Sequence, residues 1–214
     1  GTFLEGSGGR TISLVKSGSA TLTLSGTAAY TGTTTVEAGT LLINGTQTGA
    51  GLITVSSGAT LGGIGSVSQV LVAAGGTLAP GNNPGKFPNH RPLDFDPAAF
   101  LSLELGAPSL VQNTGTDFVT VGGALTLGGT INISAISGFG TPGFGDKWLV
   151  MTSAGGIADN GVTIGSAPAL GGGMTFAIDT TDDGKVFLAV VPEAGTGALF
   201  TLALALFLLR RVRG

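Results

Sequence analysis

The stretch 35-TVEAGTLLING-45 decides the fold, because two stretches that follow it, 54-TVSSGATLGGIG-65 and 71-LVAAGGTLAPGN-82, repeat its pattern. Each has a valine, then a turn of small residues that contains glycine, and then Thr-Leu. The repeated positions are Val36, Val55 and Val72, and Leu22, Leu41, Leu61 and Leu78. Successive valines lie 19 and 17 residues apart, and successive leucines 19, 20 and 17. Self-similarity at a fixed period of about 20 residues is typical of a solenoid, in which each repeat stacks on the next.

Short alternating segments between the turns predict strands rather than helices. The segments 21-TLTL-24, 34-TTV-36 and 52-LITV-55 have the period-2 pattern of a strand with one buried face. Glycines and the pair Asn44-Gly45 separate these segments and indicate tight turns, at corners that need φ > 0. We therefore expect an all-β chain forming a parallel β-helix of roughly eight to ten coils. Leu, Val and Ile should lie in inward rows, and Thr and Ser in outward rows.

The composition fits a folded rod with an uncharged surface. The 214 residues include 40 Gly, 42% are hydrophobic and only 10% are charged, whereas a disordered chain would be poor in apolar residues and highly charged. Apart from three arginines near the end, the body has 12 acidic and 6 basic residues. An acidic body without a basic stripe excludes nucleic acid as a partner. The absence of cysteine excludes disulfides, thiol nucleophiles and cysteine-ligated zinc.

The stretch 20-ATLTLSGTAAYTGTTTVEAGTLLINGT-46 resembles the autotransporter-associated β-strand repeat. The matching elements are the Thr-Leu-Thr-Leu start, Tyr30-Thr31-Gly32, Thr-Thr-Val and Gly-Thr-Leu. The segments 58–67 and 75–85 are similar to the usual continuation of that repeat, and 93–133 to what commonly follows it. The resemblance implies a right-handed β-helix of a secreted or surface-displayed bacterial protein. It does not imply a ligand.

The chain ends in an apolar run, 195–209, followed by Arg210, Arg211 and Arg213. The run is apolar all round, which predicts a C-terminal transmembrane helix. Its 15 residues would rise about 22 Å as a helix, so it needs a thinned bilayer and snorkelling arginines. Arginines that flank a span mark its cytoplasmic end, so the body would lie outside the inner membrane. The alternative is a buried C-terminal helix packed on the solenoid.

Val191-Pro192-Glu193, the apolar run and the arginine cluster together resemble the PEP-CTERM sorting signal. The resemblance implies cleavage near the motif by an exosortase, an integral-membrane processing enzyme, and release to the cell surface or extracellular matrix. Pro192 and Glu193 match the motif, while Ala194 stands in place of its second proline. Proline should keep the motif extended. A plain membrane anchor without cleavage is the alternative.

Candidate catalytic residues are few. His90 is the sole histidine, and Arg91, Asp94 and Asp96 are close to it in sequence. A Ser-His-Asp site could use His90 with either aspartate, but no G-x-S-x-G motif accompanies it. We interpret His90 as a loop residue beside an inserted bend.

Further acidic residues do not form a recognisable site. Glu104 and Asp117 are single acids on expected strands or turns, whereas a lyase or glycosidase site needs paired carboxylates with cations. The stretch 179-DTTDDGK-185 lacks the order of a calcium loop and is interpreted as a hairpin turn. Trp148 is expected in the core or capping a coil end, and 81-GNNPG-85 is expected to be a turn rather than a phosphate loop. We expect no cofactor and no metal.

Four segments follow from these patterns: a repeat region at 1–85, an irregular proline-rich insert at 86–97, a second β-solenoid region at 98–190 and the sorting signal at 191–214. No signal peptide is visible, so we interpret Gly1 as a processed or truncated N-terminus.

The sequence predicts a structural or adhesive protein that is not an enzyme. It would pass through the inner membrane of a Gram-negative-type bacterium to the cell surface or matrix, where extracellular polysaccharide is a candidate ligand. The alternatives are a secreted polysaccharide-acting β-helix enzyme and a simple membrane-anchored surface protein.

Overall fold

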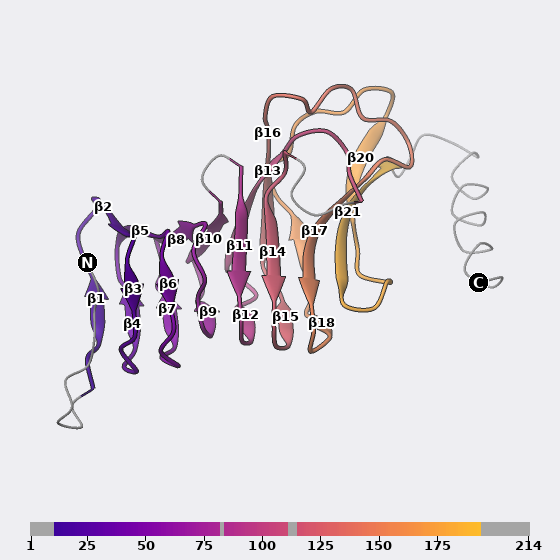
Figure 1. The fold of residues 1–214 in the computed structure, drawn as a ribbon. Coiled ribbons are helices and arrows are strands. Elements are labelled where there is room, and N and C mark those ends of the chain that lie inside the picture. The colour runs from indigo at the N-terminus through magenta and orange to yellow at the C-terminus, as the bar shows by residue number, and fades with distance from the viewer. Residues whose placement is uncertain (1–10, 82–83, 111–114, 194–214) are drawn as a thin grey trace.

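A computed structural model describes residues 11–81, 84–110 and 115–193 (Figure 1). Every regular element in these ranges is a β-strand, so the all-β prediction is confirmed for them. They include no helix that is long and apolar enough to cross a membrane. The run 195–209, for which the sequence predicts a transmembrane helix, lies outside the described residues, as do the three arginines that follow it.

The strands stack as a parallel β-solenoid with three faces, whose coils follow one another from β1 to β18 (Figure 1). Sheet 1, in stacking order, contains β1 (Leu14–Lys16), β4 (Thr34–Val36), β7 (Ile53–Val55), β9 (Val70–Val72), β12 (Leu93–Phe95), β15 (Leu125–Leu127) and β18 (Ile157–Asp159). Sheet 2 contains β2 (Thr21–Leu24), β5 (Gly39–Ile43), β8 (Ala59–Gly63), β10 (Thr77–Pro80), β13 (Phe100–Leu105), β16 (Thr130–Ala135) and β19 (Thr163–Ile164).

The third face begins as a pair of two-residue strands and widens along the rod. The pair is β3 (Thr27–Ala28) and β6 (Thr46–Gln47), and isolated bridges at Ser66 and Val67 connect it to a five-stranded sheet. That sheet contains β11 (Lys86–Asn89), β14 (Phe118–Val121), β17 (Lys147–Ser153), β21 (Lys185–Pro192) and β20 (Met174–Asp179). We call the whole face sheet 3.

The register confirms both repeated rows of the sequence. Val36, Val55 and Val72 are direct partners on sheet 1, and the leucines from Leu22 to Leu78 are direct partners on sheet 2. Parallel strands repeat about every 4.8 Å, so each apolar side chain lies on its counterpart in the next coil. From the second coil onward, the side chains of these two rows are fully buried.

The coils lengthen along the rod, which reduces their number below the eight to ten that we expected. Paired residues are 19 apart between Val36 and Val55, but 32 apart between Leu93 and Leu125 and again between Leu125 and Ile157. Sheets 1 and 2 each contain seven strands in the described part of the chain. The later coils use part of their extra residues for the longer strands β13, β16 and β17, which enclose a wider core.

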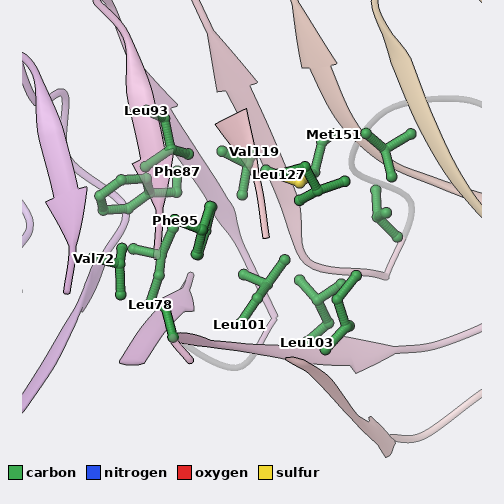
Figure 2. Close-up of a cluster of buried hydrophobic side chains, with 14 of the residues drawn as sticks. Val72, Leu78, Phe87, Leu93, Phe95, Leu101, Leu103, Val119, Leu127 and Met151 are labelled. Carbon is green, nitrogen blue, oxygen red and sulfur yellow. The ribbon is translucent and has the colours of Figure 1, made fainter. Parts of the chain in front are cut away.

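Aromatic residues fill this wider core. Phe87 of sheet 3 and Phe95 of sheet 1 are at most 2% exposed, and they point into the same interior as Leu78 and Leu101 of sheet 2 (Figure 2). The side chains from the three faces meet one another there, so a single continuous core runs through the stacked coils.

Glycine serves two different purposes at the corners. Gly39 begins β5, and Gly58 and Gly75 lie just before β8 and β10. Their φ angles are 66°, 74° and 74°, a conformation that favours glycine, as expected. Gly45 was expected in a similar turn, but it is not among the glycines with positive φ. A Cβ there would lie 2.0 Å from the carbonyl oxygen of Gly26 in the preceding coil, so this glycine permits close stacking of two backbones.

The segment 86–97 is not an irregular insert. It contains β11 and β12, which pair with β14 and β15 and continue the solenoid. Pro88 is accommodated because the preceding coil contributes only isolated bridges at Ser66 and Val67 beside β11, so a missing backbone donor there breaks no regular ladder; the Pro88 carbonyl oxygen still accepts the backbone N–H of Val67 at 3.0 Å.

The region 98–190 does not end as a parallel solenoid. Strand β21 pairs antiparallel with β17, and β20 pairs antiparallel with β21. Only antiparallel strands can be joined by the short turn between β20 and β21. The resulting hairpin covers the edge of β17, which would otherwise present unpaired backbone groups.

Adjacent leucines on β5 allow a matched test of this architecture. Leu41 is 0% exposed in the inward row, whereas the side chain of Leu42 is half-buried on the opposite face of the strand. Leu41→Ala should lower the free energy of unfolding by about 2–5 kcal/mol because it leaves a cavity, and Leu42→Ala by less than about 1 kcal/mol. Urea unfolding followed by circular dichroism would measure both. A larger loss for Leu42→Ala would contradict the assigned register.

Candidate functional site

The residues around His90 do not form a catalytic group. His90 lies in an exposed connection after β11, so its interpretation as a loop residue is confirmed. The hydroxyl of Thr126 donates to Asp94 Oδ1 at 2.7 Å, and the backbone N–H of Ala98 donates to Asp96 Oδ1 at 2.9 Å. The Asp94 carboxylate therefore links β12 to β15 of the next coil, and the Asp96 carboxylate supports its own turn.

Asp117 is the most deeply buried acidic residue in the described part of the chain. It is 1% exposed, and its two carboxylate oxygens accept backbone N–H groups from Gly85 and Glu104, both at 2.8 Å. Desolvation by burial raises the pKa of Asp117 to about 7, although the two hydrogen bonds oppose this shift and the neighbouring Glu104 carboxylate adds to it. The carboxyl group thus joins β13 to the end of the loop that begins at Gly81.

Sequence reasoning placed Asp117 on a strand or turn but missed this burial. The donors are 32 and 13 residues away along the chain, so no local pattern identifies the contact. Glu104 itself lies half-buried on β13. In the described residues, no three His, Cys, Asp or Glu side chains are grouped as a metal site would require. The loop at 81–85 is described only at its ends, since residues 82–83 lie outside the described ranges.

The turn 179–185 joins β20 to β21, which confirms the hairpin interpretation. Its carboxylates make ion pairs with lysines: Asp179 with Lys147 at 2.8 Å, and Asp182 with Lys185 at 2.9 Å. Burial would raise the pKa of Asp179, but hydrogen bonds from Lys147 and Thr181 lower it overall. These charges stabilise the hairpin locally.

Trp148 is a core residue at the capped end of the rod, as expected. It is 0% exposed, and its Nε1 donates to the carbonyl oxygen of Gly106 at 3.0 Å. Its ring stacks on Phe139 with centroids 5.6 Å apart and contacts Phe176 of β20. Because the Trp148 ring is buried and its indole N–H is already hydrogen-bonded, it cannot offer a stacking surface to a sugar.

The outer faces of the solenoid carry the remaining candidate for function. The outward row of sheet 2, which we call the threonine row, contains Thr21, Thr40, Thr60, Thr77, Phe100, Thr130 and Thr163. The equivalent row of sheet 1 contains Val15, Thr35, Thr54, Leu71, Asp94, Thr126 and Ala158. The outward threonine rows expected from the sequence are therefore present, and the row on sheet 2 is the more regular.

The proposed sorting motif lies at the end of the hairpin. Val191 pairs with Thr175 and Pro192 with Met174 in the antiparallel ladder, and the backbone N–H of Glu193 donates to Gly173 O at 2.8 Å. The motif is extended up to Pro192, and Glu193 is exposed where the described residues end.

Comparison with known proteins adds evidence that is independent of the geometry. Residues 14–43 match the family model of the passenger-associated-transport-repeat. A segment of 109 residues, 50% of this chain, is 37% identical to the adhesin BmaC autotransporter of Brucella suis biovar 1 (strain 1330). This match covers 3% of the length of that relative. The predicted resemblance to an autotransporter-associated repeat is thus confirmed.

The buried carboxyl group predicts a specific pH dependence. Because the pKa of Asp117 is raised from 3.8 to about 7 in the folded chain, folding favours its protonated form. The contribution of the Asp117 carboxyl group to the free energy of unfolding is therefore complete below about pH 4 and is lost as the pH rises to about 7. Asp117→Asn cannot ionise, so the stability of the wild type relative to this variant should fall over that range.

Urea unfolding midpoints of both proteins at pH 4 and pH 7.5 would test this expectation. Asp146→Asn, a change at an exposed turn that carries no such burial, is the control and should show no comparable trend. The prediction would be contradicted if the wild-type midpoint, relative to that of Asp117→Asn, stayed constant or rose between pH 4 and pH 7.5.

Proposed function

We propose that this protein is a structural or adhesive β-solenoid of the surface or extracellular matrix of a Gram-negative-type bacterium. The observation that carries the proposal is the uncharged threonine row along sheet 2. It is supported by the match to the passenger-associated-transport-repeat and by 37% identity over half of the chain to an autotransporter adhesin. A rod of stacked coils offers long, regular faces for contact with polysaccharides or other cells. In keeping with related repeats, we propose a right-handed coil.

We propose no enzymatic role. A lyase or glycosidase would need carboxylates brought together in a groove with cations. Asp94, Asp96 and Asp117 instead accept hydrogen bonds that support turns and neighbouring strands. The described acids therefore favour a scaffold over a polysaccharide-cleaving enzyme.

We further propose that the C-terminal segment 191–214 is a sorting signal recognised by an exosortase-type enzyme. The run 195–209 would hold the protein transiently in the inner membrane, with Arg210, Arg211 and Arg213 on the cytoplasmic side. The hairpin supports a particular position for the cut. Cleavage after Glu193 leaves every pair between β20 and β21 in place, whereas cleavage before Val191 removes two of them.

Adhesion can be tested in the native host with the full-length protein. Deleting its gene should reduce attachment of cells to one another or to matrix-coated surfaces several-fold, because the exposed solenoid faces would be lost. Re-expression of the full chain should restore attachment. Unchanged attachment and unchanged matrix content in the deletion strain would contradict the proposal.

Sorting can be tested by intact mass of the protein in membrane and extracellular fractions of the host. We expect the extracellular form to end at or just after Glu193, because this preserves the hairpin. Glu193→Gln should reduce the released fraction and increase the membrane-bound fraction, whereas Asp183→Asn in the exposed turn should change neither. Full-length protein confined to the membrane would show instead that the tail is a simple anchor.

A further inference from the structure

The threonine row of sheet 2 has the geometry of a linear binding surface. Its seven positions are directly paired from strand to strand, so at about 4.8 Å per strand the row extends about 29 Å along the rod. The flanking inward residues, such as Leu41 and Leu61, are fully buried, which fixes the threonines on the outer side of the sheet. The spacing of hydroxyl groups along the row is thus set by the backbone and does not depend on flexible loops.

Several hydroxyl groups of this row are available to a ligand. Thr130 and Thr163 share a hydrogen bond of 3.4 Å. Within the described residues, the side chains of Thr40, Thr60 and Thr77 make no hydrogen bond to the protein, and each is half-exposed. Three unused donor and acceptor groups therefore stand in line.

Phe100 interrupts the row directly after Thr77. It is 37% exposed, whereas Phe87, Phe95 and Phe118, which lie on strands of sheets 1 and 3, are at most 2% exposed. This outward aromatic ring, which lies between two threonines of the row, is not part of the buried core cluster. A flat apolar ring beside a line of hydroxyl groups is instead suited to the C–H face and hydroxyl groups of a sugar.

The charge of this face indicates which glycan it could accept. The second outward row of sheet 2 is also uncharged and contains Thr23, Leu42, Gly62, Ala79, Ser102 and Asn132. The body of the protein has 12 acidic and 6 basic residues. These two rows are uncharged, and the next outward residue of β13 is Glu104, so the charge beside them is negative. Such a face on an acidic body disfavours anionic polymers such as uronates and is compatible with neutral ones.

We propose that the threonine row binds an extended, neutral polysaccharide, with one sugar ring stacked on Phe100 and the chain running across Thr77, Thr60 and Thr40. This inference rests on the proposed adhesive function and specifies its ligand class. Sheet 1 is a poorer candidate because Leu71 and Asp94 interrupt its outward row, and the Asp94 carboxylate already binds Thr126.

The test uses the full-length protein in detergent, with binding measured to hydroxyethyl cellulose, galactomannan and polygalacturonate. We expect saturable binding to at least one of the two neutral polymers and none to polygalacturonate. Phe100→Ala should weaken that binding about tenfold or more, as truncation of a central aromatic contact does. Phe100→Trp should retain it, because the stacking surface remains.

Two matched pairs of variants separate the row from general effects on the fold. Thr60→Val on the row should weaken binding about threefold to tenfold by removing one hydrogen-bonding group, whereas Thr54→Val on sheet 1 should leave it unchanged. Phe144→Ala removes an exposed aromatic ring away from sheet 2 and should also have no effect. Urea unfolding midpoints close to the wild-type value would show that each variant is folded.

The outcomes distinguish this inference from the proposed function. Binding to a neutral polymer that survives Phe100→Ala and Thr60→Val, or preferential binding to polygalacturonate, would overturn the assignment to this row. Absence of binding to all polymers, with host attachment still dependent on the protein, would overturn the glycan surface and leave the adhesive function in place. Attachment that does not depend on the protein would remove the basis of both.

Discussion

The in-register stacking of parallel strands is the constraint on which the rest of this structure depends. A single coil cannot bury its apolar side chains alone, and each row from Val36 or Leu41 becomes buried only against its counterpart in the next coil. The same register that aligns the apolar side chains inside must align the threonines outside. The core and the outer face are therefore two consequences of one repeat.

Departures from the simple repeat occur in the first and last coils that the structure describes. At the first coil, Lys16 occupies the inward position that Val36 holds in the next coil, and its ammonium group donates to the carbonyl oxygens of Ser17, Gly18 and Ala38. At the other end, aromatic residues around Trp148 fill a wider interior beneath the antiparallel hairpin. The carbonyl groups compensate the buried charge of Lys16, and the antiparallel hairpin covers an edge of β17 that would otherwise attract other strands.

Local patterns in the sequence were sufficient to predict the repetitive part of the fold. The spacing of the valines and leucines identified the paired rows correctly, and alternation placed the threonines outside. What could not be predicted depends on distant partners. The sequence around Pro88 suggested an irregular insert. The strand tolerates this proline because the preceding coil contributes only isolated bridges beside it, and the sequence does not show that arrangement. Asp117 resembled any surface acid, because Gly85 and Glu104, which bind it, are far from it in sequence.

The C-terminal hairpin also determines how the rod would respond to mechanical load. Strand β21 is bonded to β17 on one side and to β20 on the other, and it leads directly to Glu193. A pull delivered at Glu193 along the axis of β21 would shear two ladders at once, so many hydrogen bonds would have to break together. A pull applied across the stack would instead separate one coil from the next, a few bonds at a time. A pull at Glu193 along β21 would therefore meet more resistance than a pull that separates neighbouring coils.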